Sequence, residues 1–304
     1  MKVERSLRRS IIRRSSDPRP SSEPFISGDS FRKIADHIFE READLTPDRL
    51  KSVAERNVVF VASDLIEAFA KNGHPCIKHP YILITHNGDD RIARRDLSLL
   101  DDGKILAWFA QNAAVAHERL IPLPIGLENA HYANNGRTDV FKKITAEKDL
   151  SKLNAMSGAE RRPNIIASFS IGTNVTVRKP LAELLKILPT VDYFPAQMAL
   201  DRSPMTRATH LSRSMFIASP QGNGLDCHRT WEAMYVGTIP IVERSIAMEY
   251  FEKLGLPLWI IDDWSELSNF DAAALARKYA EIMGDSSAVA LRLEYWKEAM
   301  RRVQ

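Results

Sequence analysis

The chain has 304 residues, of which 44% are hydrophobic and 27% charged, so it can form one large or two medium-sized globular domains. Two cysteines, Cys76 and Cys227, are too few for a disulfide framework and predict a reducing, cytoplasmic environment. The net charge of +3 is uneven, because residues 1–20 hold seven basic and two acidic side chains and the remaining residues sum to −2. A nearly neutral body argues against nucleic-acid binding, and no apolar run reaches the roughly 20 residues of a membrane-spanning helix.

Residues 1–24 alternate Arg, Ser and Pro and lack the apolar core of a secretory signal. We expect a disordered, solvent-exposed basic tail. Two alternatives stay open. Residues 1–20 could attach the protein peripherally to an anionic membrane surface, where each basic side chain contributes about 1 kcal/mol, or the segment could be an organelle transit peptide.

Short apolar runs between glycines and prolines predict alternating helices and strands in the first half of the chain. An amphipathic stretch at 31–42 and a helix at 64–71 are expected. Expected strands are residues 57–62, 81–85 and 104–109. The segment 120–129 contains two prolines and a glycine and is expected to form a constrained loop, and residues 134–162 a helix and a connection.

The alternation restarts in the second half, with helices expected at 175–188 and 227–236. Expected strands are residues 164–169, 191–194, 215–219, 239–242 and 258–261. Continuous apolar strands alternating with helices are typical of parallel sheets covered on both faces. The sequence therefore predicts two Rossmann-like domains, 25–155 and 156–304, that face a cleft, with the last helix packing back on the first domain.

The segment 219–242 runs strand, glycine loop, helix and strand. Gly222 and Gly224 allow positive φ and close backbone approach, and Asp226 is the expected N-cap of the helix. Exposed N–H groups at such a helix start can bind phosphate oxygens. The loop therefore predicts an anion site.

Helical spacing divides the residues of this helix between two faces. The buried face is expected to hold Cys227, Trp231 and Met234, and a polar ridge to hold His228, Arg229 and Glu232. Arg229 suits a diphosphate, and the Glu232 carboxylate can accept hydrogen bonds from two ribose hydroxyls. The alternative is that the ridge is a surface cluster of salt bridges.

A second interpretation of the loop concerns dinucleotide binding. Residues 222–227 imitate the GxGxxG pattern, and Glu243 ends the next strand, where a dinucleotide-binding acid belongs. Cys227 stands in place of the third glycine, and the motif lies late in the chain. A nicotinamide-dependent oxidoreductase is therefore an alternative function.

The string PQGNGLDCHRTWEAMYVGTIPIV, residues 220–242, resembles the hallmark of exostosin-like glycosyltransferases, that is, glycosyltransferase family 47 and its bacterial relatives. Supporting stretches are residues 84–89, 108–112, 123–129 and 256–264. The resemblance spans residues 57–265 and implies a GT-B fold, a nucleotide-sugar donor held mainly by the C-terminal domain, and inversion at the anomeric carbon. Many exostosin-like sequences carry Arg at the position of Gln221, which leaves one phosphate contact in doubt.

Glycosyl transfer needs stabilisation of the departing diphosphate and a base for the acceptor hydroxyl. The chain contains no Asp-x-Asp metal clamp, so we expect no metal and no cofactor, and assign the leaving-group charge to Arg178, Arg229 and helix N–H groups. The predicted donor-binding residues are Arg178, Gly222, Asn223, Gly224, Asp226, His228, Arg229 and Glu232.

The base is expected from the N-terminal half, across the cleft from the donor. His86, Asp89 and Asp90 follow the expected strand 81–85, and Glu128 lies in a Pro/Gly loop. Histidine has the best intrinsic pKa for a base at neutral pH. The predicted catalytic candidates are therefore His86, Asp90 and Glu128, with the alternative that residues 86–89 are only a tight turn.

These features together predict an inverting hexosyl- or pentosyltransferase. It would move a sugar from a nucleotide sugar, with UDP-sugars favoured, to a glycan hydroxyl in the synthesis of cell-surface polysaccharide or glycoconjugate. The protein is expected in the cytoplasm or peripherally on the membrane. Besides the oxidoreductase, a non-catalytic nucleotide-sugar-binding subunit remains an alternative.

Overall fold

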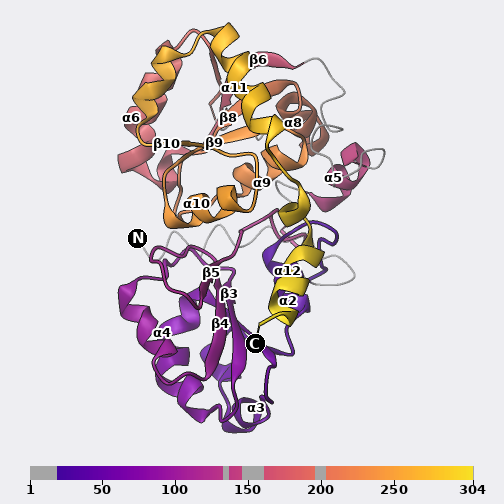
Figure 1. Ribbon diagram of the computed structural model, residues 1–304, viewed down its shortest axis with the longest axis vertical. Coiled ribbons are helices and arrows are strands. Elements are labelled where there is room, and N and C mark those ends of the chain that lie inside the picture. The colour runs from indigo at the N-terminus through magenta and orange to yellow at the C-terminus, as the bar shows by residue number, and fades with distance from the viewer. Residues whose placement is uncertain (1–18, 133–136, 146–160, 196–202, 304) are drawn as a thin grey trace.

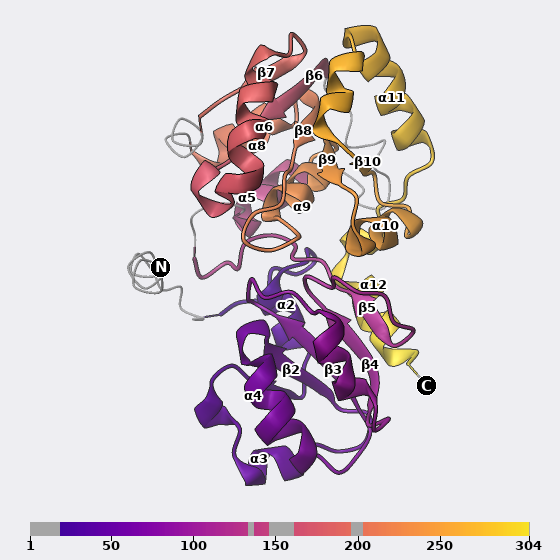
Figure 2. The ribbon, with the colours of Figure 1, turned by 90° about the vertical axis from the view of Figure 1, so that its left-hand side faces the viewer.

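The computed structural model describes residues 19–132, 137–145, 161–195 and 203–303. These residues form two α/β domains, each built on a parallel five-stranded sheet, and the domains lie one above the other along the long axis of the molecule (Figures 1 and 2). Side chains of both domains line two cavities between them. Two Rossmann-like domains that face a cleft are the GT-B architecture, so the predicted fold class is confirmed.

The N-terminal sheet has its strands in chain order, β1-β2-β3-β4-β5, all parallel. The strands are β1 (His37–Phe39), β2 (Val58–Ala62), β3 (Tyr81–His86), β4 (Ile105–Ala110) and β5 (Leu120–Pro122). The helices are α2 (Gly28–Lys33), α3 (Pro47–Lys51) and α4 (Ile66–Ala68). Shorter turns are η1 (Glu42–Asp44), η2 (Ser63–Leu65), η3 (Phe69–Gly73), η4 (His74–Cys76) and η5 (Arg94–Leu100).

Both faces of this sheet are buried. Phe60 of β2 packs into the core that continues into the C-terminal domain, whereas its neighbours Val59 and Val61 pack into a second core with α3 and α4. In β3, Ile84 and Leu83 divide between the same two cores. Because successive side chains of a strand point to opposite faces, burial on both faces requires the continuous apolar runs seen in the sequence.

The C-terminal sheet has the order β10-β9-β8-β6-β7 and is also parallel. Its strands are β6 (Arg162–Ala167), β7 (Val191–Tyr193), β8 (Ser214–Ala218), β9 (Ile239–Glu243) and β10 (Trp259–Ile261). The helices are α5 (Thr138–Thr145), α6 (Val175–Ile187), α8 (Pro204–Leu211), α9 (His228–Tyr235), α10 (Ile246–Lys253), α11 (Ala272–Gly284) and α12 (Leu293–Arg301), with turns η7 (Ile171–Thr173), η8 (Trp264–Asn269) and η9 (Val289–Leu291). The strand order reverses between β6 and β8.

The C-terminal helix α12 crosses to the N-terminal domain, where it lies beside α2 (Figure 1). The buried ring of Trp296 contacts Phe31 edge to face, with 6.4 Å between the ring centroids. The N–H of Leu293 donates to the carbonyl of Pro24 at 3.0 Å. The end of the chain thereby joins the two domains.

Part of the predicted tail packs on this same region. Arg19 forms ion pairs with Asp29 at 2.5 Å and with Glu40 at 2.6 Å, and Ser22 is fully buried. The predicted boundary at residue 24 is therefore wrong for residues 19–24. Residues 1–18 lie outside the described residues, so their disorder and their contact with an anionic membrane stay predictions.

The strands β2, β3, β4 and β6 to β10 and the helices α6 and α9 confirm their predicted elements within one to three residues. The amphipathic stretch expected at 31–42 is not a single element, because it contains the end of α2, to Lys33, and residues 37–39, which pair with β2 as strand β1. The loop expected at 120–129 contains strand β5, whose Pro122 is tolerated at the end of an edge strand. The segment expected as a helix at 64–71 is helical, but it consists of consecutive 3-10, α and π turns, η2, α4 and η3, and not of one regular α-helix.

No helix among the described residues combines the length and apolar character needed to cross a membrane.

We expect Trp296→Ala to lower the free energy of unfolding by about 3–5 kcal/mol, because it removes a large buried side chain that joins two domains. The measurement is chemical denaturation of the full chain. Ile187→Ala, at a side chain that is 77% exposed on α6, is the matched control and should change stability by less than about 0.5 kcal/mol. Equal stabilities of the two variants would contradict the packing of α12 described above.

Candidate active site

A cavity of about 510 Å³ lies between the two domains. The C-terminal domain lines it with the segment 168–173 after β6, the segment 222–227 after β8, the start of α9 and parts of α5 and α8, and the N-terminal domain adds Asp89 and Ile125. We call it the donor cavity, after the residues predicted for donor binding that line it. In the C-terminal sheet the strand order reverses between the neighbours β6 and β8. The cavity lies beside the segments that follow these two strands, which is where open α/β sheets bind ligands.

The donor cavity brings together all the residues predicted for donor binding. Arg178, Gly222, Asn223, Gly224, Asp226, His228, Arg229 and Glu232 line it. They come from α6, the loop after β8 and the first turn of α9, which are up to 54 positions apart in the chain. Their individual roles differ from those that we predicted.

The glycines of the loop allow other side chains to lie close to its backbone. They are not needed for positive φ, which neither Gly222 nor Gly224 adopts. A Cβ atom on Gly224 would lie 2.7 Å from the side-chain nitrogen of Asn112 in the other domain. A Cβ on Gly222 would lie 3.0 Å from the Arg178 guanidinium. Asn223, between them, is exposed at the edge of the cavity.

Arg178 holds the glycine loop in place. Its Nε donates to the carbonyl of Gln221 at 3.0 Å and its Nη2 to that of Pro220 at 2.8 Å. Nη1 donates to the carbonyl of Ser170 and the hydroxyl of Thr173, and the thiol of Cys227 lies 3.6 Å from Nη2. With its five N–H groups occupied, Arg178 does not fit the predicted role of a direct phosphate ligand.

The polar ridge of α9 faces the cavity as predicted. Trp231 and Met234 are fully buried on the opposite face, whereas Arg229 and Glu232 are half-buried and line the cavity. The prediction is wrong for Cys227, which was expected on the buried face but is the half-buried N-cap of α9 and lines the cavity. Burial raises the pKa of Glu232. Within the described residues the Arg229 guanidinium forms no hydrogen bond or ion pair, so the alternative of a salt-bridged surface cluster does not fit it.

Asp226 is not the N-cap of α9, which is Cys227. Its buried carboxylate instead accepts hydrogen bonds from the N–H of Ile125 at 2.9 Å, the indole of Trp231 at 2.7 Å and the N–H of Cys227 at 2.7 Å. Burial raises the pKa of Asp226 to about 6. The predicted donor-binding role is therefore wrong for this carboxylate, which joins the two domains.

Three further hydrogen bonds attach the start of α9 and the residues before it to the N-terminal domain. The side-chain oxygen of Asn112 accepts from the N–H groups of Leu225 and Asp226, at 3.0 and 3.2 Å. Nδ1 of His228 lies 2.8 Å from the carbonyl of Gly126. Gly126 adopts φ of +67°, and a Cβ there would lie 2.3 Å from a backbone oxygen of Ile26, so only glycine fits.

A second cavity, of about 290 Å³, lies at the carboxyl ends of β3 and β4. We call it the acceptor cavity, because the predicted acceptor-side residues His86 and Asp90 line it. Polar side chains line most of it, among them Asp64, His86, Asn87, Asp89, Asp90, Gln111 and Asn129, and Tyr132 adds an aromatic ring. Asp89, Ile125 and His228 line both cavities, so the two meet at these residues.

His86 does not fit the predicted role of the base. The side chain is buried, its Nδ1 accepts a hydrogen bond from the N–H of Asn87 at 2.8 Å, and its Nε2 then carries the proton donated to the carbonyl of Pro124 at 3.0 Å. Burial lowers the pKa of His86 to about 4. Both ring nitrogens are occupied, so no lone pair is available for a substrate proton.

The other predicted bases lie in different places. Asp90 is exposed and lines the acceptor cavity. Glu128 lines neither cavity, although its charge contributes to the raised pKa of Glu232.

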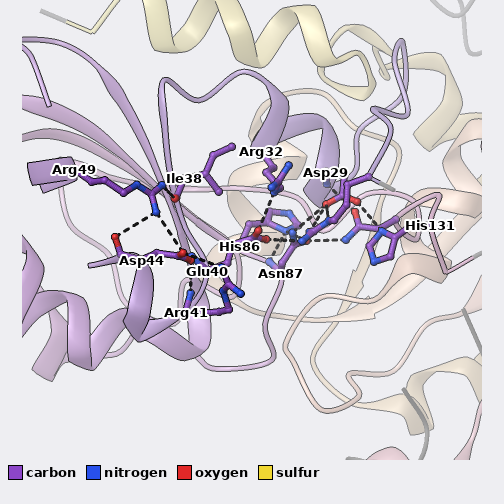
Figure 3. Close-up of polar contacts among 12 residues, drawn as sticks. Asp29, Arg32, Ile38, Glu40, Arg41, Asp44, Arg49, His86, Asn87 and His131 are labelled. Atoms are coloured by element: carbon purple, nitrogen blue, oxygen red, sulfur yellow. Dashed lines mark hydrogen bonds and ion pairs between the residues drawn. The ribbon is translucent and has the colours of Figure 1, made fainter. Parts of the chain in front are cut away.

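A buried carboxylate behind the acceptor cavity orients two of its amide side chains (Figure 3). Asp29 is fully buried and pairs with Arg19 and with Nδ1 of His131, the latter at 2.8 Å. The amide of Asn87 donates to Asp29 at 3.4 Å, and that of Asn129 donates to Asn87 at 2.9 Å. No local sequence pattern marks this cluster, because its partners are up to 112 positions apart in the chain.

The part of the chain that the structure describes contains no group of three or more His, Cys, Asp or Glu side chains arranged to hold a metal ion.

No protein-family model matches the chain, and no characterised protein matches it by sequence. Among solved structures, a trehalose 6-phosphate synthase from Burkholderia multivorans is similar with a TM-score of 0.46 and 10% identity, over 84% of this chain and 74% of that one. The spinosyn rhamnosyltransferase SpnG bound to thymidine diphosphate is similar with a TM-score of 0.35 and 12% identity, over 80% and 69%. The same enzyme in complex with spinosyn aglycone is similar with a TM-score of 0.35 and 13% identity, over 81% of this chain and 70% of that one. Membership of the exostosin-like family stays a prediction.

We expect the His86 ring to remain neutral at about pH 5.5, because burial holds its pKa near 4. The measurement is an NMR titration of the histidine ring resonances, with His86 assigned by its absence in a His86→Gln variant. A midpoint near 6.5, the value of a solvated imidazole, would contradict the burial and hydrogen bonding described for this ring.

Proposed function

We propose that the protein is an inverting glycosyltransferase that takes a nucleotide sugar in the donor cavity and a glycan hydroxyl in the acceptor cavity. The observation that carries the proposal is that the two cavities meet at Asp89, Ile125 and His228. A sugar attached at the end of a nucleoside diphosphate would reach this junction from one side, and an acceptor hydroxyl from the other. Such an arrangement holds two reactants in contact and limits access of water.

The donor cavity offers groups suited to each part of a nucleoside diphosphate. Arg229, at the start of α9, has a guanidinium available for the diphosphate, in addition to the helix N-terminus. Glu232 lies one turn further along the same ridge and can accept two ribose hydroxyls. Phe169 and Leu211 add apolar surface for a nucleobase.

Inversion requires one displacement, in which the acceptor oxygen attacks the anomeric carbon from the face opposite the diphosphate. The departing diphosphate gains negative charge, and Arg229 together with the first turn of α9 would stabilise it. We retain UDP-sugars as the favoured donors and cell-surface glycan synthesis as the process.

The oxidoreductase alternative has less support. The carboxylate of Glu243, which would have to bind the ribose of a dinucleotide, accepts hydrogen bonds from Gln221 and from the indole of Trp264, each at 3.0 Å. The glycine loop also follows β8, the third strand of its domain in chain order, and not the first.

Calorimetric titration with UDP, GDP and NAD tests the choice of ligand. The proposal predicts binding of a nucleoside diphosphate, and binding of NAD alone would contradict it. A panel of nucleotide sugars, read by release of nucleoside diphosphate, then tests turnover. Binding without release of nucleoside diphosphate, with or without glycan acceptors, would instead favour a non-catalytic binding subunit.

We expect Glu232→Ala to weaken binding of the nucleoside diphosphate by roughly 10–150-fold, because it removes an acceptor worth about 1.5–3 kcal/mol. Arg229→Ala should weaken the same binding by a similar factor while leaving nucleoside binding unchanged. Glu183→Ala, which removes an exposed carboxylate on α6, is the matched control. Calorimetry gives the affinities, and wild-type affinity in both ridge variants would exclude the ridge from the donor site.

A further inference from the structure

His228 is the imidazole that lies at the junction of the two cavities. It is the first residue of α9, is half-buried, and lines both the donor and the acceptor cavity. Three residues, Asp89, Ile125 and His228, line both cavities. The side chain of Ile125 cannot accept a proton. Asp89 is exposed, and a carboxylate is a weaker base than an imidazole.

The two ring nitrogens of His228 are in different situations. Nδ1 lies 2.8 Å from the carbonyl of Gly126, which can only accept, so Nδ1 carries the hydrogen and Nε2 keeps its lone pair. Within the described residues no hydrogen bond to Nε2 is present. His86 has the opposite tautomer and no unoccupied nitrogen.

The carbonyl that selects this tautomer is itself fixed. Gly126 adopts φ of +67° against the backbone of Ile26, in a position that excludes any Cβ. The adjacent Ile125 donates its N–H to Asp226, so the same loop is attached to the C-terminal domain at two points. The imidazole is therefore oriented by backbone and not by a mobile side chain.

We propose that His228 is the general base of the transfer reaction, an inference that rests on the proposed function. Nε2 takes the proton of the acceptor hydroxyl while a lone pair of that oxygen forms the bond to the anomeric carbon. The bond from this carbon to the diphosphate oxygen breaks, and its electron pair leaves with the nucleoside diphosphate. The imidazolium then returns its proton to solvent.

The charges around the ring belong to several elements. The titratable and charged groups facing it are His86 from β3, Asp89 from the turn after β3, Asp226 from the glycine loop, and Arg229 and Glu232 from α9. The carboxylates of Asp226 and Glu232 would stabilise the imidazolium after proton transfer, and Arg229 would oppose it. The site can thus hold the transferred charge for the duration of the step.

The test is His228→Asn, whose amide N–H can retain the bond to Gly126 while no basic nitrogen remains. With a donor and acceptor that the wild type turns over, kcat should fall by about 10²–10⁴-fold, and nucleotide affinity should change by less than about threefold. The acidic limb of the kcat–pH profile should disappear. Added imidazole should restore part of the activity of His228→Ala.

Three results would overturn the inference. One is near-wild-type kcat in a folded His228→Asn. Another is an equal loss of affinity and rate, which would make His228 a donor ligand. The third is a 10²–10⁴-fold loss in Asp89→Asn with retained activity in His228→Asn, which would transfer the role to Asp89. A wild type that binds nucleotide but turns over no donor would refute the proposed transferase itself, an outcome visible before any variant is made.

Discussion

The carboxylate of Asp226 is the interaction on which the geometry of both cavities depends. It is buried at the start of α9 and accepts hydrogen bonds from Cys227 and Trp231 in its own domain and from Ile125 in the other. Removing a buried acceptor with several donors leaves each of them unsatisfied at a cost of about 1–3 kcal/mol. The loop 123–129 and the first turn of α9 are thereby kept in contact, and these two segments supply Ile125 and His228, two of the three residues at the junction of the cavities.

Two buried groups near the junction give folding stability opposite dependences on pH. His86 has a pKa lowered to about 4, so the unfolded chain binds more protons between about pH 4 and 6.5 and stability rises with pH across this range. Asp226 has a pKa raised to about 6, so the folded protein binds more protons between about pH 4 and 6 and stability falls as pH rises. The two effects have opposite signs over overlapping pH ranges, so they offset each other in part.

The sequence predicts elements well where local pattern decides them. Apolar runs identified most strands, and helical spacing separated Trp231 from Arg229 and Glu232 correctly. The failures have long-range causes. Strand β1 exists because residues 37–39 pair with β2, and no local pattern marks it. The partners of Arg178 and His86 are backbone carbonyls of Pro220, Gln221 and Pro124, which no side-chain motif reveals. Likewise, Asn112 and Gly126 lay in stretches already noted, but their contacts with the glycine loop required the fold.

Hydrogen–deuterium exchange in the presence of a saturating nucleoside diphosphate tests most directly whether the cavity between the domains is the donor site. We predict slower exchange in the segments 168–173 and 222–229, most of whose residues line that cavity, and unchanged exchange in α11, on the far side of the C-terminal domain (Figure 2). Binding accompanied by protection elsewhere, with these two segments unchanged, would contradict the assignment of the cavity and with it the proposed reaction.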